Sequence, residues 1–154
     1  MPVPPYYDWI AHHAHRRPNQ LAINDLQTHR TYTYAELHQR ADRLKDMIIS
    51  GGENVYSAEV ENAISLMPGV GEVAVIGVPD ERWGERVHAI IVPKPGAGLT
   101  PESVLEFCRE QIAGYKCPRS VDFRDTPLPL SGAGKVLKRD LREPYWKGFA
   151  KAVN

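Results

Sequence analysis

The chain has 154 residues, of which 42% are hydrophobic and 25% are charged, as in a globular protein with one domain or one domain and an appendage. Basic and acidic residues both number 19, so the formal net charge is +0, which argues against nucleic-acid binding. The two cysteines, Cys108 and Cys117, are too few for a disulfide framework. The sequence has neither a signal-peptide pattern nor an apolar run of about 18 residues. We therefore expect a soluble, cytoplasmic protein with no membrane span.

The N-terminal part of the chain predicts a helix, two short strands and a second helix. Pro18 ends the first helix, because proline lacks the amide hydrogen that would continue it. Thr33 is followed three residues later by Glu36, the spacing of a capping box at the start of the second helix. The predicted elements span residues 6–17, 21–23, 31–33 and 34–44.

The remainder predicts strands that alternate with helices. Ser50, Gly51 and Gly52 form a turn after the first strand, and Pro79-Asp80 marks another turn. We expect Ser57 to cap one helix and Thr100, with Pro101 after it, to cap the next. Strands are predicted over residues 47–49, 70–78, 86–93 and 121–123, and helices over 57–67, 101–112 and from about 135 onward. This alternation in a short chain predicts an α+β domain with a small sheet.

Several reactive side chains have a structural interpretation. The helix predicted over 101–112 has an apolar side, and Cys108 on that side is expected to be a buried thiol. His88 lies within a predicted strand and is expected to be structural. His12, His13 and His15 are one to three residues apart without an acidic or cysteine partner, so we predict no metal site.

Three segments stand out as motifs. They are KDMIISGGENVY at 45–56, continued by SAEVE at 57–61; GVPDERWG at 77–84; and LPLSGAGKVLKRDLR at 128–142. In this order and spacing they closely resemble the C-terminal domain of AMP-forming acyl-CoA synthetases, in the adenylate-forming ligase superfamily. The resemblance covers residues 45–148 and implies a short mixed sheet flanked by helices. It divides the chain into an N-terminal segment (1–44), this domain (45–148) and a tail (149–154).

Lys135 is the candidate catalytic residue. It follows Gly134 in a glycine-rich loop, from which an ammonium can reach another domain's cleft and stabilise a carboxylate attacking a phosphate. The resemblance implies this role in adenylation, whereas spacing alone fits a solvated lysine equally well. The loop is not a phosphate-binding P-loop, because Pro129 and Val136 replace the glycine and the Ser or Thr of that pattern.

The resemblance also implies a hinge and a nucleotide contact. Lys45 matches the hinge residue about which the small domain rotates between two poses, and Arg43 matches an arginine that contacts the adenylate ribose. Both residues also fit a simpler interpretation, a basic helix end that is favourable to the helix dipole.

A second group of residues matches the coenzyme A site of the family. Gly51, Gly52 and Glu53 match a loop that borders the pantetheine tunnel. Trp83 matches an adenine-stacking position, although partial burial in the core is an equally reasonable role. Tyr115 and Lys116 match a coenzyme A contact, but Cys117 replaces a basic residue found in some relatives.

Residues 1–44 contain PNQLA at 18–22 and TYTYAEL at 31–37, and through these segments they resemble the extreme N-terminus of the same family. The parent enzyme would join a carboxylic acid to coenzyme A through an acyl-AMP, using ATP and Mg²⁺, as in fatty acid metabolism. The phosphate loop, adenine motifs and acyl pocket are missing between the two parts, as after an in-frame internal deletion. We therefore expect no tight ATP or coenzyme A binding and no complete ligase activity from this chain alone, and no particular acid is implied.

Two hypotheses follow for the chain as it stands. It is the mobile domain of such a ligase, dependent on a large adenylation domain as its partner. Alternatively, it is a non-catalytic module that binds a partner or self-associates, as a homo-oligomer or by domain swapping, because the N-terminal helices lack their packing partners.

Overall fold

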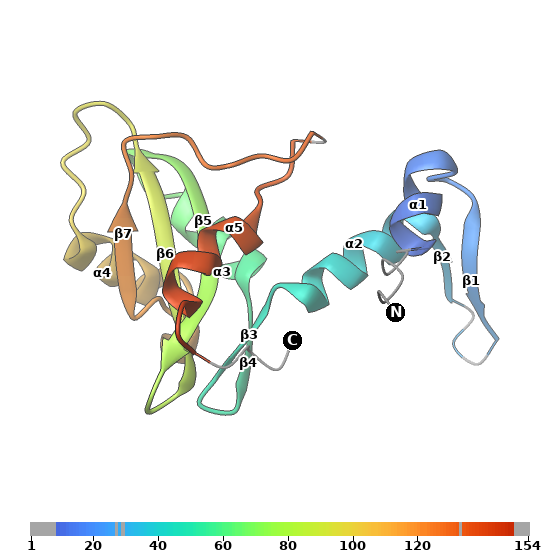
Figure 1. Cartoon of the computed structure of the whole chain (residues 1–154), viewed down its shortest axis with the longest axis horizontal. Helices are drawn as coiled ribbons and strands as arrows, with labels where there is room; N and C mark the ends of the chain where they lie inside the picture. The colour runs from blue at the N-terminus through green and yellow to red at the C-terminus, as the bar shows by residue number, and fades with distance from the viewer. Residues whose placement is uncertain (1–8, 27, 29, 133, 150–154) are drawn as a thin grey trace. The chain divides into compact units, whose positions relative to one another are not determined.

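The computed structural model describes residues 9–26, 28, 30–132 and 134–149 (Figure 1). The side chains of residues 9, 11, 39 and 42–45 lie outside this description. The chain forms two compact units, residues 1–45 and 46–154, which are described separately below. The predicted boundaries at 44/45 and 148/149 stay predictions.

The first unit is a two-stranded sheet with two helices. Its elements are α1 (Trp9–Arg16), β1 (Leu21–Asp25), β2 (Arg30–Thr33) and α2 (Tyr34–Lys45). Strands β1 and β2 are antiparallel. At the start of α2 the Thr33 amide donates to Glu36 Oε2 at 2.8 Å, and the Glu36 amide donates to Thr33 Oγ1 at 3.3 Å. These two bonds confirm the predicted capping box.

The second unit is a five-stranded mixed sheet between helices. Its elements are β3 (Met47–Ser50), β4 (Glu53–Tyr56), α3 (Ser57–Ser65), β5 (Val70–Asp80), β6 (Gly84–Pro93), α4 (Pro101–Gln111), the 3₁₀ turn η1 (Gly114–Lys116), β7 (Ser120–Phe123) and α5 (Lys138–Trp146). The strand order is β4-β3-β6-β5 in antiparallel pairs, and β7 pairs parallel to β6. This arrangement confirms the predicted α+β class.

Each face of this sheet has its own apolar cluster, because successive side chains of a strand point to opposite faces. Helices α3 and α4 cover one face, where Val60, Ile64, Val104 and Cys108 are fully buried. Helix α5 covers the other face, and its Leu141 packs with residues of β5 and β6 (Figure 1). The predicted burial of Cys108 is confirmed.

Four local predictions differ from the structure. The chain after Gly51 and Gly52 (φ 62° and 85°) turns back as strand β4, which was not predicted. Pro79-Asp80 belongs to the end of β5 rather than to a turn, and α3 ends at Ser65, before the predicted 67. Ser57 does not cap α3; its hydroxyl instead accepts a hydrogen bond from the Lys138 ammonium.

No helix among the described residues is both long enough and apolar enough to cross a membrane.

Candidate functional site

The β3–β4 turn and the β5–β6 turn meet at one end of the second unit. The Gly51 amide donates to the carbonyl oxygen of Trp83 at 2.9 Å. The Asp80 carboxylate in turn accepts the Trp83 amide at 3.1 Å, which fixes the β5–β6 turn. The structure thus brings together Gly51 and Trp83, two residues that the sequence assigned to one site.

Two guanidinium groups lie over the half-buried indole of Trp83. The Arg119 guanidinium carbon is 4.2 Å from the ring centroid and that of Arg82 is 4.8 Å away. Both distances suit cation–π contact. A positive charge beside an aromatic face can recognise an anionic ligand that carries a nucleobase. Neither arginine was predicted from the sequence: Arg82 lies within the GVPDERWG motif, but nothing local connects Arg119 with Trp83.

Lys116 in η1 is already engaged in an ion pair. Its Nζ is 2.6 Å from Glu59 Oε1, a carboxylate of α3. This hydrogen bond is the main reason why the pKa of Lys116 is raised. The neighbouring Tyr115 is 46% exposed. Lys116 would have to exchange Glu59 for a ligand, whereas the Tyr115 ring is accessible.

Lys135 lies on an exposed, tightly bonded loop before α5. The Ser131 amide donates to the Lys135 carbonyl at 2.7 Å, and the Leu137 amide donates to the Pro129 carbonyl at 2.8 Å. Leu130 and Val136 form a β-bridge within the same loop. The loop and the β3–β4 turn lie at opposite ends of the second unit (Figure 1), so Lys135 and Trp83 belong to two separate surfaces.

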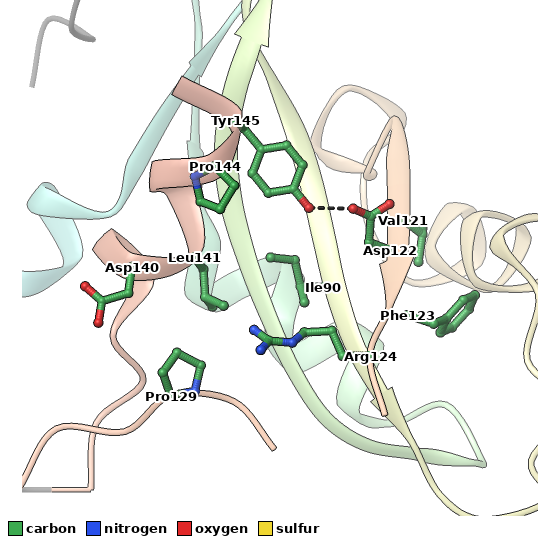
Figure 2. Close-up of a pocket in the computed structure, with 10 residues that line it drawn as sticks. All are labelled: Ile90, Val121, Asp122, Phe123, Arg124, Pro129, Asp140, Leu141, Pro144 and Tyr145. Atoms are coloured by element: carbon green, nitrogen blue, oxygen red, sulfur yellow. Dashed lines mark hydrogen bonds between the residues drawn. The ribbon is translucent and has the colours of Figure 1, made fainter. Parts of the chain in front are cut away.

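A shallow groove of about 580 Å³ runs between β7 and α5. Figure 2 shows Tyr145 of α5 pointing across it to Asp122 of β7, to which its hydroxyl donates a hydrogen bond. Burial, and then this carboxylate, raise the pKa of Tyr145 to about 12. The groove therefore holds a neutral phenol that ties α5 to the sheet.

His88 of β6 completes this contact from beneath. It is 2% exposed, with Nδ1 2.7 Å from Ser120 Oγ and Nε2 3.1 Å from the Tyr145 hydroxyl. Since that hydroxyl donates to Asp122, Nε2 carries the proton and donates to it, and Nδ1 accepts from Ser120. Burial lowers the pKa of His88. The ring has the structural role that the sequence predicted.

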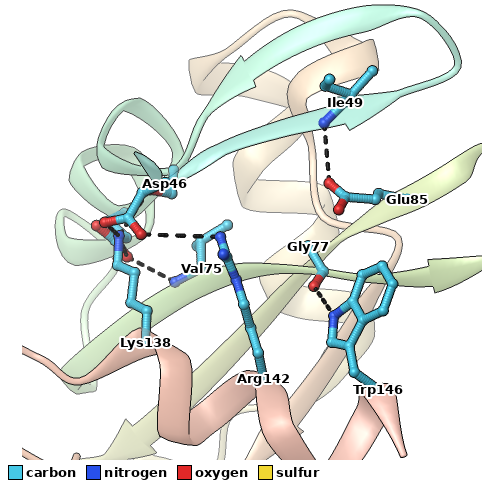
Figure 3. Close-up of polar contacts among 10 residues, drawn as sticks. Asp46, Ile49, Val75, Gly77, Glu85, Lys138, Arg142 and Trp146 are labelled. Atoms are coloured by element: carbon cyan, nitrogen blue, oxygen red, sulfur yellow. Dashed lines mark hydrogen bonds and ion pairs between the residues drawn. The ribbon is translucent and has the colours of Figure 1, made fainter. Parts of the chain in front are cut away.

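A second polar cluster lies where α5 begins (Figure 3). The Lys138 ammonium is 2.7 Å from Ser57 Oγ, 2.8 Å from Glu61 Oε1 and 3.5 Å from Asp46 Oδ2. Arg142, one turn further along α5, lies 3.9 Å from the other oxygen of Asp46. From the sequence this segment was predicted only as a helix from about residue 135, and the cluster was not predicted.

Arg43 and Lys45 are the last predicted site residues. Their backbones belong to the end of α2, and their side chains lie outside the described residues. Within the described part of the chain, no three His, Cys, Asp or Glu side chains gather in a way that could hold a metal ion.

Comparison with known proteins places this geometry in a family. Residues 59–135 match the model of the AMP-binding enzyme C-terminal domain. The chain is 54% identical over 104 residues to a feruloyl-CoA synthase of Amycolatopsis sp., covering 68% of this chain and 21% of that protein. It is 46% identical over 113 residues to the fatty acid–[acyl-carrier-protein] ligase ScoC of Streptomyces coeruleorubidus. This match covers 73% of this chain and 22% of that protein.

A solved structure agrees with these sequence relatives. A Mycobacterium tuberculosis fatty acyl CoA synthetase superposes with a TM-score of 0.63 at 51% identity, covering 67% of this chain and 20% of that one. The chain thus spans about a fifth of the length of the relatives it matches. It belongs to the AMP-binding enzyme C-terminal domain family and corresponds to the C-terminal domain of adenylate-forming acyl-CoA ligases.

Proposed function

We propose that this chain is the mobile catalytic domain of an acid–coenzyme A ligase and that it acts only together with a large domain that binds ATP and acid. The observation that carries the proposal is the family match over residues 59–135, which ends at Lys135 itself. The placement of the loop before α5 and of the β3–β4 turn at opposite ends of the second unit supports it (Figure 1). A domain with two working surfaces suits a reaction with two steps and a rotation between them.

In the first step Lys135 would act on adenylate formation. The substrate carboxylate attacks the α-phosphorus of ATP, the bond to the β-phosphate oxygen breaks, and pyrophosphate leaves. Negative charge increases on the phosphoryl oxygens in the transition state, where a positioned ammonium lowers the barrier. The bonded loop around Lys135 restricts the orientations of its backbone and so supports this role.

In the second step the opposite end of the domain would face the thiol substrate. The thiolate attacks the acyl carbon of the adenylate, and AMP leaves. Trp83 with Arg82 and Arg119 would hold the nucleotide of coenzyme A, and Tyr115 with Lys116 would contact it from η1. Gly51, Gly52 and Glu53 would border the pantetheine arm, because a turn with glycines allows close approach of a thin ligand.

The last residues before the boundary between the two units would permit the exchange of surfaces. Lys45 would be the hinge and Arg43 would contact the adenylate ribose. The division of the chain between Lys45 and Asp46 supports a hinge at this place.

Complementation of a separated large domain tests this function. The Amycolatopsis feruloyl-CoA synthase without its C-terminal fifth is mixed with this chain, and ferulate-dependent ATP–pyrophosphate exchange is measured. We expect exchange with the wild-type chain, a loss of at least about a hundredfold with Lys135→Ala, and no loss with the exposed control Lys94→Ala. Equal rates with and without the Lys135 side chain would overturn the catalytic proposal. Coenzyme A and an acyl carrier protein are then compared as thiol acceptors.

One observation favours the alternative, a self-associating module. The first unit exposes the apolar side chains of Leu21, Ile23 and Leu26 by 53%, 41% and 79%, and such surfaces favour association. Sedimentation of the wild-type chain and of Ile23→Lys tests it. A dimer that the substitution dissociates supports the alternative, and a monomer throughout contradicts it.

A further inference from the structure

The first residue of α5 is a lysine whose charge is almost enclosed. The Lys138 side chain is 13% exposed, and its ammonium contacts three oxygen atoms from two other segments: Ser57 and Glu61 of α3, and Asp46 before β3. The ammonium donates a hydrogen bond to the Ser57 hydroxyl and forms ion pairs with the two carboxylates. Lys138 is therefore built into the fold and is not a solvated member of a basic helix.

Its partners are themselves fixed. The Glu61 oxygen that accepts from Lys138 also accepts the Val75 amide at 2.7 Å, so this carboxylate is held against β5. The Arg142 guanidinium lies beside the Asp46 carboxylate. Charge-assisted hydrogen bonds in a partly buried site are stronger than neutral ones. Removal of the lysine would take one cation from Glu61 and leave Asp46 with the Arg142 guanidinium at 3.9 Å.

The connection from Lys138 back to Lys135 is short and bonded. Only two residues separate them, and the Leu137 amide between them donates to the Pro129 carbonyl. Strand-like pairing of Val136 with Leu130 closes the loop. A displacement of the Lys138 end must therefore move the Lys135 backbone.

The other end of the contact lies at the boundary between the two units. Asp46 is the first residue of the second unit and directly follows Lys45. The Lys138–Asp46 ion pair, together with Arg142, thus joins the segment that carries Lys135 to the residue at which the unit begins (Figure 3).

From these contacts we propose that Lys138 is a positioning residue. It fixes the Lys135 loop to the boundary at Asp46, so that the loop and the boundary move as one rigid body. The expected effect of this coupling on catalysis rests on the function proposed above. The coupling itself is a property of this chain alone.

Amide hydrogen exchange of the whole 154-residue chain tests the coupling. In Lys138→Ala we expect the Ser131 and Leu137 amides to exchange about tenfold faster, as the loss of a charged hydrogen bond implies, while the Ala89 amide in β6 is unchanged. Arg139→Ala, on the exposed side of the same helix, is the matched control, and Lys138→Arg should restore slow exchange. If Lys138→Ala does not fold, Lys138→Met replaces it. Loop exchange equal to that of Arg139→Ala would overturn the proposal.

The complementation assay separates this inference from the proposed function. We expect Lys138→Ala to lower kcat of pyrophosphate exchange about tenfold with an unchanged KM for ATP, because it displaces Lys135 without removing a substrate contact. Accelerated loop exchange without complementation by any variant would support the coupling and contradict the proposed function. Normal complementation by the wild-type chain, with kcat and loop exchange of Lys138→Ala equal to the control, would contradict the coupling alone.

Discussion

The ring of Trp83 fills the space into which a side chain at residue 51 would project. A Cβ atom on Gly51 would lie 2.5 Å from Cε3 and 2.9 Å from Cζ3 of the indole. The β3–β4 turn and the β5–β6 turn are therefore matched in shape, and a change in either turn affects the other.

Gly51→Ala should destabilise the second unit by about 2 to 4 kcal/mol, since it combines overpacking with a left-handed backbone angle. Gly52→Ala is the matched control, because residue 52 shares the positive φ but a Cβ added there would have no atom within 4 Å; its cost should be about 1 kcal/mol. Urea unfolding measures both. Trp83→Ala should reduce the cost of Gly51→Ala to that of the control, and an unchanged cost would show that the indole is not the obstacle.

Trp83→Ala should affect only the thiol-dependent step. The loss of one aromatic stacking surface should raise the KM for coenzyme A roughly tenfold. Pyrophosphate exchange by the mixture of this chain with the separated large domain should be unchanged. Trp83→Phe should raise the KM for coenzyme A less. Tyr56→Ala, at another exposed aromatic residue, should leave this KM unchanged. An equal fall in both steps would indicate a folding defect rather than a lost contact.

The stability of the second unit should fall in mild acid because of His88. Burial lowers the pKa of this ring below its ordinary value of 6.5, so the unfolded chain binds the proton more readily than the folded chain. The contribution of the neutral His88 ring to folding stability is present in full above pH 6.5. It is lost as the pH falls from 6.5 through the pKa of His88 in the folded chain. Charged or titratable groups around the ring are Asp122 of β7, Tyr145 of α5 and Arg86 of β6.

Denaturant unfolding between pH 5 and 8 measures this effect. His88→Gln should reduce stability at pH 7.5 and flatten the decline below pH 6.5, while His15→Gln, on the exposed end of α1, should leave both unchanged. A parallel decline in the wild-type chain and in His88→Gln would assign the acid sensitivity to other groups.

Neither cysteine should react rapidly in the folded chain. Cys108 is fully buried, and its burial, with a smaller contribution from Cys117, raises the pKa of its thiol to about 11. Since the thiolate is the reactive form, iodoacetamide at pH 8 should modify the native chain far more slowly than the urea-unfolded chain. Mass spectrometry counts the added groups, and rapid double modification under native conditions would contradict the predicted burial.

Features that depend on neighbouring residues could be predicted from the sequence alone. The capping box of Thr33 and Glu36, the cap at Thr100 and the Gly51-Gly52 turn need only a few consecutive residues, because their hydrogen bonds and backbone angles are local. The order of the three motifs likewise indicates the family. The strand β4 was missed, since its pairing with β3 depends on how the turn directs the chain.

Contacts between side chains that are distant in the sequence became visible in the folded chain alone. Lys138 lies 81 residues from Ser57, and Arg119 contacts a tryptophan on another turn. No periodicity connects such positions, because the contacts exist only after the sheet has assembled and helices have packed on its faces. Ser57 illustrates the difference: its local pattern predicts a helix cap, but a long-range ammonium takes its hydroxyl, because a charged partner in a partly buried site outweighs a neutral capping bond.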